Sequence, residues 1–314
     1  MAKFADTFLS EVSKYSLCVS GVPQVQGELS PQIFQKKLHQ LVQNVHASSE
    51  LTSIPFECGC ESFPQKEKNL ILEQERIKQL QDGLILMAQV PSGRELLSHM
   101  PLNVYMYAMT QTGKGFFSEV EKMLSISSRC PILWGAKKQF IKTLAHEMTH
   151  ARHTAFLQNQ TRVSKDKEWT FSPKAFFFES VFDELGARLM AEKIYSDLCK
   201  AGKINNGEKY RSISVSGMFS QMENSGYFHH FAQEIADTVG KDMNKILDED
   251  DTLNQSLGQT FSYYMKLHPS LRPKNILDKI EAQYRKLILY PAGKFVGLNR
   301  YKVNRRFKDL GYGK

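Results

Sequence analysis

Cysteine is scarce in this chain, with five among 314 residues. An odd number at low density argues against the disulfide framework of a small secreted protein. Cys58 and Cys60 form a short "CGC" stretch, but no second pair occurs elsewhere to complete a zinc knuckle. We therefore expect free thiols in a reducing compartment. The five cysteines are Cys18, Cys58, Cys60, Cys130 and Cys199.

Long apolar runs are also missing. No stretch approaches the roughly 18 to 20 apolar residues that a membrane-spanning helix needs. The amino-terminal "MAKFADTFLSEVSKYSLC" interrupts its apolar residues with Asp6, Glu11 and Lys14, unlike the unbroken apolar segment of a secretory signal. These absences predict a protein without a membrane span that is cytoplasmic, or translocated without a conventional signal peptide.

Acidic residues are the minority charge, because 33 Asp and Glu face 41 Lys and Arg, for a formal net charge of +8. Part of the excess lies in residues 293–314, "GKFVGLNRYKVNRRFKDLGYGK", where Asp309 is the only acid. Such a basic tail is typical of a solvated or frayed terminus. It could also dock on nucleic acid, on another acidic partner or on an anionic lipid surface.

The hydrophobic pattern predicts an α+β protein that is mostly helical and contains a small sheet. No internal repeat is present. We expect a helical and irregular amino-terminal region, a compact core, and a helical carboxy-terminal extension that carries the basic tail. The corresponding bounds are 1–68, 69–247 and 248–314.

Within the expected core, strands at 104–109 and 122–128 precede a long helix that begins after residue 131. The stretch "KAFFFESVFDELGARLMAEKIYSDLCK" then predicts a second long helix, which starts after Pro173 and ends near Gly202.

The most informative stretch is "LAHEMTHA", residues 144–151. His146 and His150 are four residues apart, so on a helix they lie on the same face and can bind one metal ion together. Glu147 lies about 100° further round the helix axis. It can act there as a base on metal-bound water without coordinating the metal. The pattern predicts a site for one Zn²⁺ per chain, with Glu147 as the catalytic base.

This stretch resembles the HExxH signature of the zincin metallopeptidases, and the resemblance covers about residues 70–200. It implies a zincin-like catalytic domain, with a small twisted sheet packed on the HExxH helix and a second helix that supplies a third ligand. The metzincin branch would need glycine at 153 and histidine at 156, where this chain has His153 and Phe156. We therefore expect the gluzincin type, whose third ligand is a glutamate from a later helix. We interpret His153 as a polar residue beside the site.

Two glutamates compete for the position of third ligand. Glu184, in "ELGA", fits the ExxA pattern of many gluzincin-like peptidases, and Glu179, in "ESVFD", fits the ExxxD pattern of thermolysin-like enzymes. On a helix, Glu184 lies on an apolar face whose residues next to the carboxylate are small. The face that carries Glu179 is more polar. The pattern favours Glu184, with Glu179 as the alternative. Asp183 fits a role as acceptor for a ligand histidine N–H in either case. The face of Glu184 carries Phe177, Val181, Ala187 and Ala191, and that of Glu179 carries Asp183 and Gly186.

The resemblance implies a zinc-dependent peptidase, in which zinc lowers the pKa of a bound water and Glu147 passes its proton to the leaving amine. A further donor should stabilise the oxyanion. Tyr227, His229 and His230, in "SGYFHHFAQ", are candidates, and the alternative is that they are ordinary residues at a helix start. The substrate should be an extended polypeptide that pairs with an edge strand, for which 122–128 is the candidate.

Other functions stay open at this point. A zincin-fold binding or regulatory protein, antirestriction-like or an effector, would show little proteolysis and would bind nucleic acid or protein. The basic tail suits a nucleic-acid partner. A zinc amidase acting on non-peptide bonds is a third possibility. Glu147 argues against a purely structural metal, because structural zinc needs no base.

Overall fold

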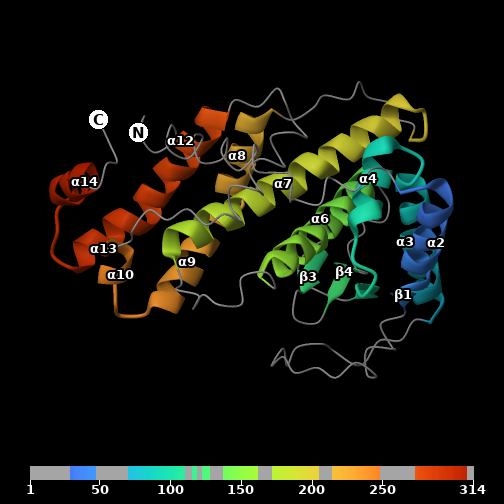
Figure 1. Ribbon diagram of the computed structural model, residues 1–314, viewed down its shortest axis with the longest axis horizontal. Coiled ribbons are helices and arrows are strands. Elements are labelled where there is room, and N and C mark those ends of the chain that lie inside the picture. The colour runs from blue at the N-terminus through green and yellow to red at the C-terminus, as the bar shows by residue number, and fades with distance from the viewer. Residues whose placement is uncertain are drawn as a thin grey trace. The chain divides into compact units, whose positions relative to one another are not determined.

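The computed structural model describes residues 29–46, 70–109, 115–118, 122–127, 137–161, 172–204, 214–247 and 273–309. Over these residues the protein is α+β, with many helices and a small four-stranded sheet (Figure 1). The chain divides into two compact units. The sheet unit comprises residues 26–163 and 186–212, and the helical unit comprises residues 1–25, 164–185 and 213–314. The bounds expected at residues 68 and 247 stay predictions.

The sheet has the order β1-β2-β4-β3. Its first three members in space are parallel, and β3 is antiparallel to β4. Leu124 on β4 is the central position, since it pairs with Met106 on one side and with Phe117 on the other. The strands are β1 (Val45–His46), β2 (Tyr105–Met109), β3 (Gly115–Ser118) and β4 (Met123–Ser127).

The strands expected at 104–109 and 122–128 are confirmed as β2 and β4, but the expectation that 122–128 forms the edge is wrong. β4 lies between β2 and β3, and all five of its residues are buried. The strand at that edge of the described sheet is β3. β3 has four residues and follows the turn-like stretch "QTGK". Four residues are too few to show the alternation of apolar and polar side chains by which a strand is recognised.

The helices of the sheet unit cover one face of the sheet. α3 contacts β1 and β2, while α6 contacts β3 and β4. α3 and α6 also approach each other closely at Gly83, where a Cβ would lie 2.9 Å from Cε1 of Phe140. The expected helix around "HEMTH" is thereby confirmed and placed against the sheet. The helices are α2 (Pro31–Gln43), α3 (Leu70–Met87), α4 (Pro91–His99) and α6 (Lys137–Thr161).

α7 (Pro173–Lys200) is the second long helix that the sequence predicts. Its first half belongs to the helical unit and its second half to the sheet unit. Within the helical unit, Phe177 and Phe178 lie against Tyr284, with ring centroids 5.5 and 6.3 Å apart, and all three side chains are buried. This aromatic cluster anchors the first half of α7.

The rest of the helical unit consists of short helices. The hydrophobic pattern of the sequence also predicts helices around residues 213–247, 252–267 and 273–289. The structure has helices in the first and the last of these ranges, and the range 252–267 lies outside the described residues. The elements are α8 (Val215–Asn224), α9 (Tyr227–Val239), α10 (Asn244–Leu247), α12 (Pro273–Tyr284), the π-helical segment η2 (Arg285–Leu289), α13 (Tyr290–Phe295) and α14 (Arg300–Asp309).

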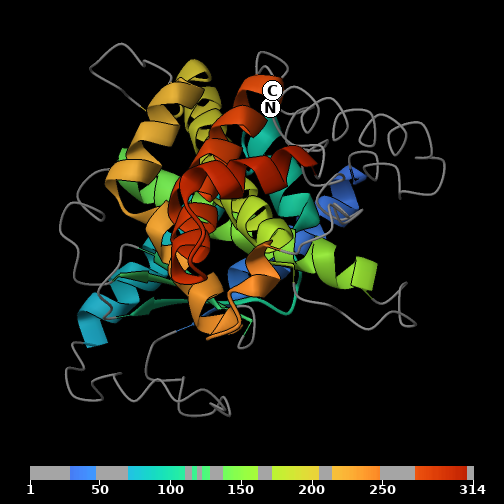
Figure 2. The ribbon, with the colours of Figure 1, turned by 90° about the vertical axis from the view of Figure 1, so that its left-hand side faces the viewer.

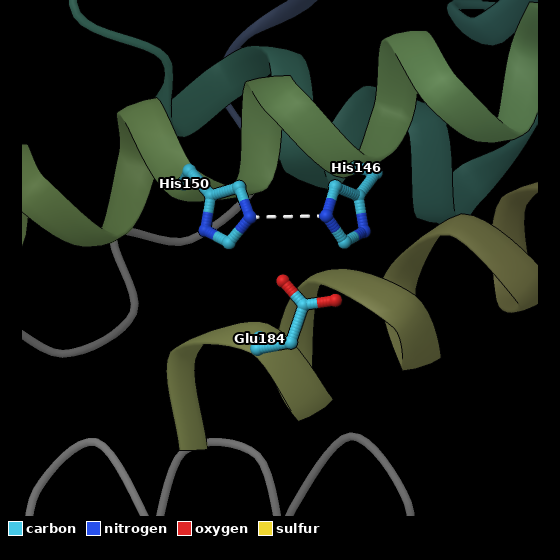
Figure 3. A group of neighbouring side chains, drawn as sticks. All are labelled: His146, His150 and Glu184. Atoms are coloured by element: carbon cyan, nitrogen blue, oxygen red, sulfur yellow. Dashed lines mark hydrogen bonds between the residues drawn. The ribbon is translucent and has the colours of Figure 1, made fainter. Parts of the chain in front are cut away.

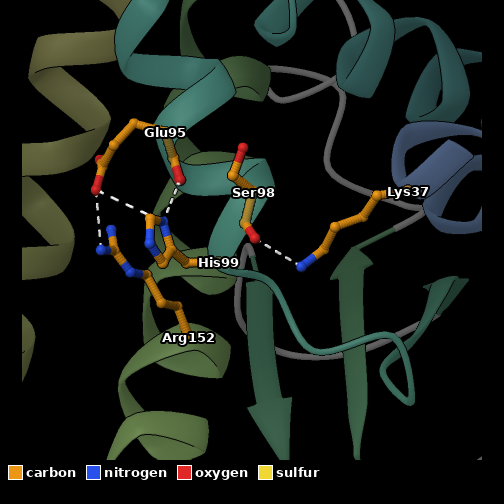
Figure 4. A network of polar contacts seen from close by, with 5 residues as sticks. All are labelled: Lys37, Glu95, Ser98, His99 and Arg152. Atoms are coloured by element: carbon orange, nitrogen blue, oxygen red, sulfur yellow. Dashed lines mark hydrogen bonds and ion pairs between the residues drawn. The ribbon is translucent and has the colours of Figure 1, made fainter. Parts of the chain in front are cut away.

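A polar network in the sheet unit ties α4 to its neighbours (Figure 4). Arg152 on α6 lies 2.9 Å from the carboxylate of Glu95, and Lys37 on α2 donates to the carbonyl of Ser98 at 2.6 Å. Nδ1 of His99 lies 2.8 Å from the carbonyl oxygen of Glu95. A carbonyl oxygen only accepts, so Nδ1 carries the proton. Burial, and then the nearby charge of Arg152, lower the pKa of His99 below its usual value.

This lowered pKa predicts a loss of stability in mild acid. In the unfolded chain, His99 takes up a proton near the ordinary histidine pKa of about 6.5. In the folded protein its pKa is lower, so the unfolded chain binds more protons in mild acid. Stability linked to His99 is therefore complete above about pH 6.5 and falls as the pH drops toward the folded pKa. Urea unfolding should show that the free energy of unfolding decreases less with falling pH for His99→Gln than for the wild type. His39→Gln, at an exposed position on α2, is the control. Equal pH dependence of His99→Gln and the wild type would contradict the prediction.

Candidate metal centre

α6 places the two histidines of "HEMTH" side by side. Their Nε2 atoms are 3.0 Å apart, and the rings meet edge to face with centroids at 4.6 Å. Figure 3 shows both imidazoles pointing toward the carboxylate of Glu184 on α7. One ligand atom from each of His146, His150 and Glu184 lies within 4.8 Å of the others. These three residues could therefore hold a metal ion.

The spacing of the two imidazole nitrogens is close to that of two ligands of one metal ion such as zinc. Tetrahedral Zn²⁺ with nitrogen ligands at about 2.0–2.1 Å separates two such nitrogens by roughly 3.3 Å. The observed spacing of the Nε2 atoms is close to that value. Two imidazole nitrogens and one carboxylate are also a ligand set that zinc accepts in catalytic sites, where it retains a fourth position.

Of the two candidate glutamates, the structure brings Glu184 to the histidines. Its side chain is 3% exposed, and Phe177, Val181 and Ala187 on the same face are fully buried. A carboxylate buried on an apolar face is costly unless a cation or hydrogen-bond donors compensate it. Glu179 is half-buried and lies outside the group. That Glu184 binds a metal stays a prediction, but the helix face inferred for it from the sequence is the buried one.

An ion pair within the sheet unit joins α6 to the second half of α7. Lys142 of α6 contacts the carboxylate of Glu192 of α7, and both side chains are less than one-fifth exposed. The Lys142 ammonium also lies 5.2 Å from the ring centroid of Tyr195. Lys142 precedes His146 by about one helical turn, and Glu192 follows Glu184 by about two turns. The pair therefore joins the two helices within the sheet unit.

Glu147 has a different neighbour from the two histidines. It is 8% exposed, and its carboxylate lies against the start of β3. A Cβ at Gly115 would lie 2.6 Å from its Oε1 and 2.7 Å from its Cγ. Only glycine therefore leaves room for the Glu147 side chain in this position. In the sequence, "QTGKG" indicates a turn. It gives no sign of this contact, because the contact joins residues far apart in the chain.

The remaining candidates are not members of this group. Asp183 is half-buried on α7, and Tyr227, His229 and His230 form the first turn of α9. His229 and His230 are exposed, and Nε2 of His230 lies 3.3 Å from the carboxylate of Glu234. Their roles as hydrogen-bond acceptor and oxyanion donors stay predictions.

Two further expectations fall partly outside the described residues. His153 belongs to α6, but its side chain is not among those described. Cys199, on α7, is a free thiol, and the other four cysteines lie outside the described residues. No helix in the described part of the chain is long and apolar enough to cross a bilayer.

Comparisons with known proteins do not add to this picture. The chain matches no protein-family model, no curated protein and no solved structure. Function can therefore be inferred only from the residues of the site.

Zinc affinity should show whether Glu184 or Glu179 is the third metal ligand. We expect the wild type to bind one Zn²⁺ per chain and Glu184→Ala to bind it at least about 100-fold more weakly, since a missing ligand costs more than the 10 to 100-fold typical of an outer-shell change. Glu179→Ala is the matched control on the same helix and should bind like the wild type. Isothermal titration with zinc measures both. Unchanged affinity in Glu184→Ala, or a loss confined to Glu179→Ala, would reject the assignment.

Proposed function

We propose that this protein is a zinc-dependent peptidase of the gluzincin-like type, with His146, His150 and Glu184 as metal ligands and Glu147 as general base. One observation carries the proposal. Glu184 joins the two histidines in a group that could hold a metal ion, while Glu147 lies buried against a strand. Ligands and base therefore have separate positions, as hydrolysis by an activated water requires.

The chemistry follows from these positions. A bound Zn²⁺ would lower the pKa of a coordinated water and polarise the carbonyl of the substrate. Glu147 accepts the proton of the attacking water and later donates it to the leaving amine nitrogen. Burial of Glu147 beside Gly115 restricts the rotamers of its carboxylate, so the proton is held at a defined place.

β3 is the place where an extended polypeptide would bind. Within the described sheet it pairs only with β4, and Phe116 on it is 52% exposed. An extended peptide can add to such an edge through main-chain hydrogen bonds. A peptide on this edge would pass close to Glu147, because Gly115 of the same strand contacts that carboxylate. This supports a polypeptide as the substrate class.

Glu147→Gln tests the proposed base. The amide keeps the shape of the side chain but cannot take up a proton, so we expect zinc binding like that of the wild type and a loss of hydrolysis of at least about 100-fold. The measurement is cleavage of unfolded casein by the zinc-loaded full chain, with zinc content determined in parallel.

A chelator control shows that the measured cleavage depends on metal. Full activity of Glu147→Gln would contradict the assignment of the base. Absence of proteolysis by the wild type together with strongly salt-dependent DNA binding would favour the binding or regulatory function instead.

Gly115→Ala tests the contact between β3 and the base. The added methyl group displaces the Glu147 carboxylate, so we expect normal zinc affinity but a kcat lower by at least about 10-fold. Ser118→Ala, at the other end of β3, should leave both quantities unchanged. Comparable kcat values for Gly115→Ala and the wild type would show that the position of Glu147 does not depend on this strand.

A further inference from the structure

The basic tail forms a fixed corner between α13 and α14. Val303 of α14 is buried against Gly293 of α13, and a Cβ at Gly293 would collide with it. The intervening turn uses Gly297 with φ of +80°, and the amide of Leu298 donates to the carbonyl of Gly293 at 2.6 Å. The side chain of Asn299 accepts from the amide of Lys302 at the start of α14. This part of the tail is therefore packed, and it holds its side chains in a definite arrangement.

The outer surface of this corner combines cations with aromatic rings. Among the large hydrophobic side chains of the described residues, Tyr301 and Phe295 are the most exposed, at 72% and 66%. Exposed cations lie beside them in the chain, and no acid precedes Asp309 in this segment. We define the corner surface as Lys294, Phe295, Arg300, Tyr301, Lys302 and Arg305, all of which are exposed.

An apolar cavity of about 190 Å³ adjoins this surface. α9, α10, η2 and α13 supply its lining, which includes Ile235, Ile246, Ile288 and Phe295 and contains no charged side chain. Figure 2 looks onto α13 and α14, drawn in red. Phe295 both lines the cavity and is largely exposed, so the cavity opens beside the cations of the corner. A dry cavity of about 150 Å³ can hold a benzene molecule, so this one has room for a short hydrocarbon segment.

We propose that the α13–α14 corner binds the surface of an anionic lipid bilayer. Its cations would contact the lipid phosphates, and Phe295 and Tyr301 would insert at the level of the headgroups. The cavity would receive part of an acyl chain. Each basic residue near an anionic surface is worth roughly a five-fold gain in affinity, so the four cations need the insertion of the aromatic side chains as a second contribution to reversible binding.

The cavity favours a bilayer over nucleic acid as the partner. Cations and exposed aromatic rings serve both, because bases stack on aromatic side chains and phosphates pair with cations. A nucleic acid has no hydrocarbon segment to place in an uncharged apolar cavity, whereas a lipid has one. The inference is independent of the metal centre, since none of its residues belongs to the proposed site.

Vesicle sedimentation of the full chain tests the proposal. We expect binding to phosphatidylcholine vesicles that contain phosphatidylglycerol, and little binding to phosphatidylcholine alone. Lys294→Glu with Lys302→Glu should lower partitioning by about 20-fold or more, because two favourable charges are lost. Phe295→Ser with Tyr301→Ser should also lower it several-fold, as should Tyr301→Ser alone, which leaves the cavity intact.

The control is Ile33→Ser with Lys36→Glu, an exposed apolar residue and an exposed cation on α2. It should bind vesicles like the wild type, and so should Glu184→Ala. Thermal unfolding of each variant verifies that it is folded. No dependence on phosphatidylglycerol in the wild type would overturn the proposal. Wild-type partitioning by Tyr301→Ser and by the aromatic pair would also overturn it, and would indicate a purely electrostatic association.

Discussion

The metal site proposed for this protein depends on the approach of one buried carboxylate to two histidines. Glu184 is separated from His150 by 34 positions in the chain, yet its carboxylate lies within reach of both imidazoles. Without that approach, "HEMTH" would be two histidines on a helix with too few ligands for a catalytic metal. Glu184 lies on an apolar face of α7, where Ala187 is fully buried. The ion pair of Lys142 with Glu192 joins α6 to the second half of α7.

Glu147 depends on a different part of the fold. The same helix that presents the histidines on one face presents Glu147 to β3 on another. A spacing of one residue between His146 and Glu147 is enough for this, because consecutive residues on a helix differ by about 100°. The small sheet would therefore contribute directly to the proposed chemistry, since its edge strand limits where the carboxylate can lie. That strand is also the edge at which an extended peptide could pair, so one short element would position both the base and the substrate.

The sequence could predict those parts of the site that depend on local periodicity. The spacing of His146 and His150, the start of α7 at Pro173 and the apolar face of Glu184 all follow from the helical repeat. The role of β3 could not be predicted, because its four residues carry no clear alternation and its place at the edge depends on pairing with β4. The packing of α14 could not be predicted from the sequence for a similar reason. Its segment is rich in cations and resembles a frayed terminus, and only the fit of Val303 against Gly293 shows that it is held in place.

The most direct test of the account is the crystal structure of the zinc-loaded protein, with anomalous diffraction recorded on both sides of the zinc absorption edge. The account predicts one strong zinc peak per chain, within about 2.0–2.2 Å of Nε2 of His146, Nε2 of His150 and a carboxylate oxygen of Glu184. A zinc ion ligated by Glu179 in place of Glu184 would contradict it. So would a zinc ion held by cysteine sulfur atoms, or no zinc between the two histidines.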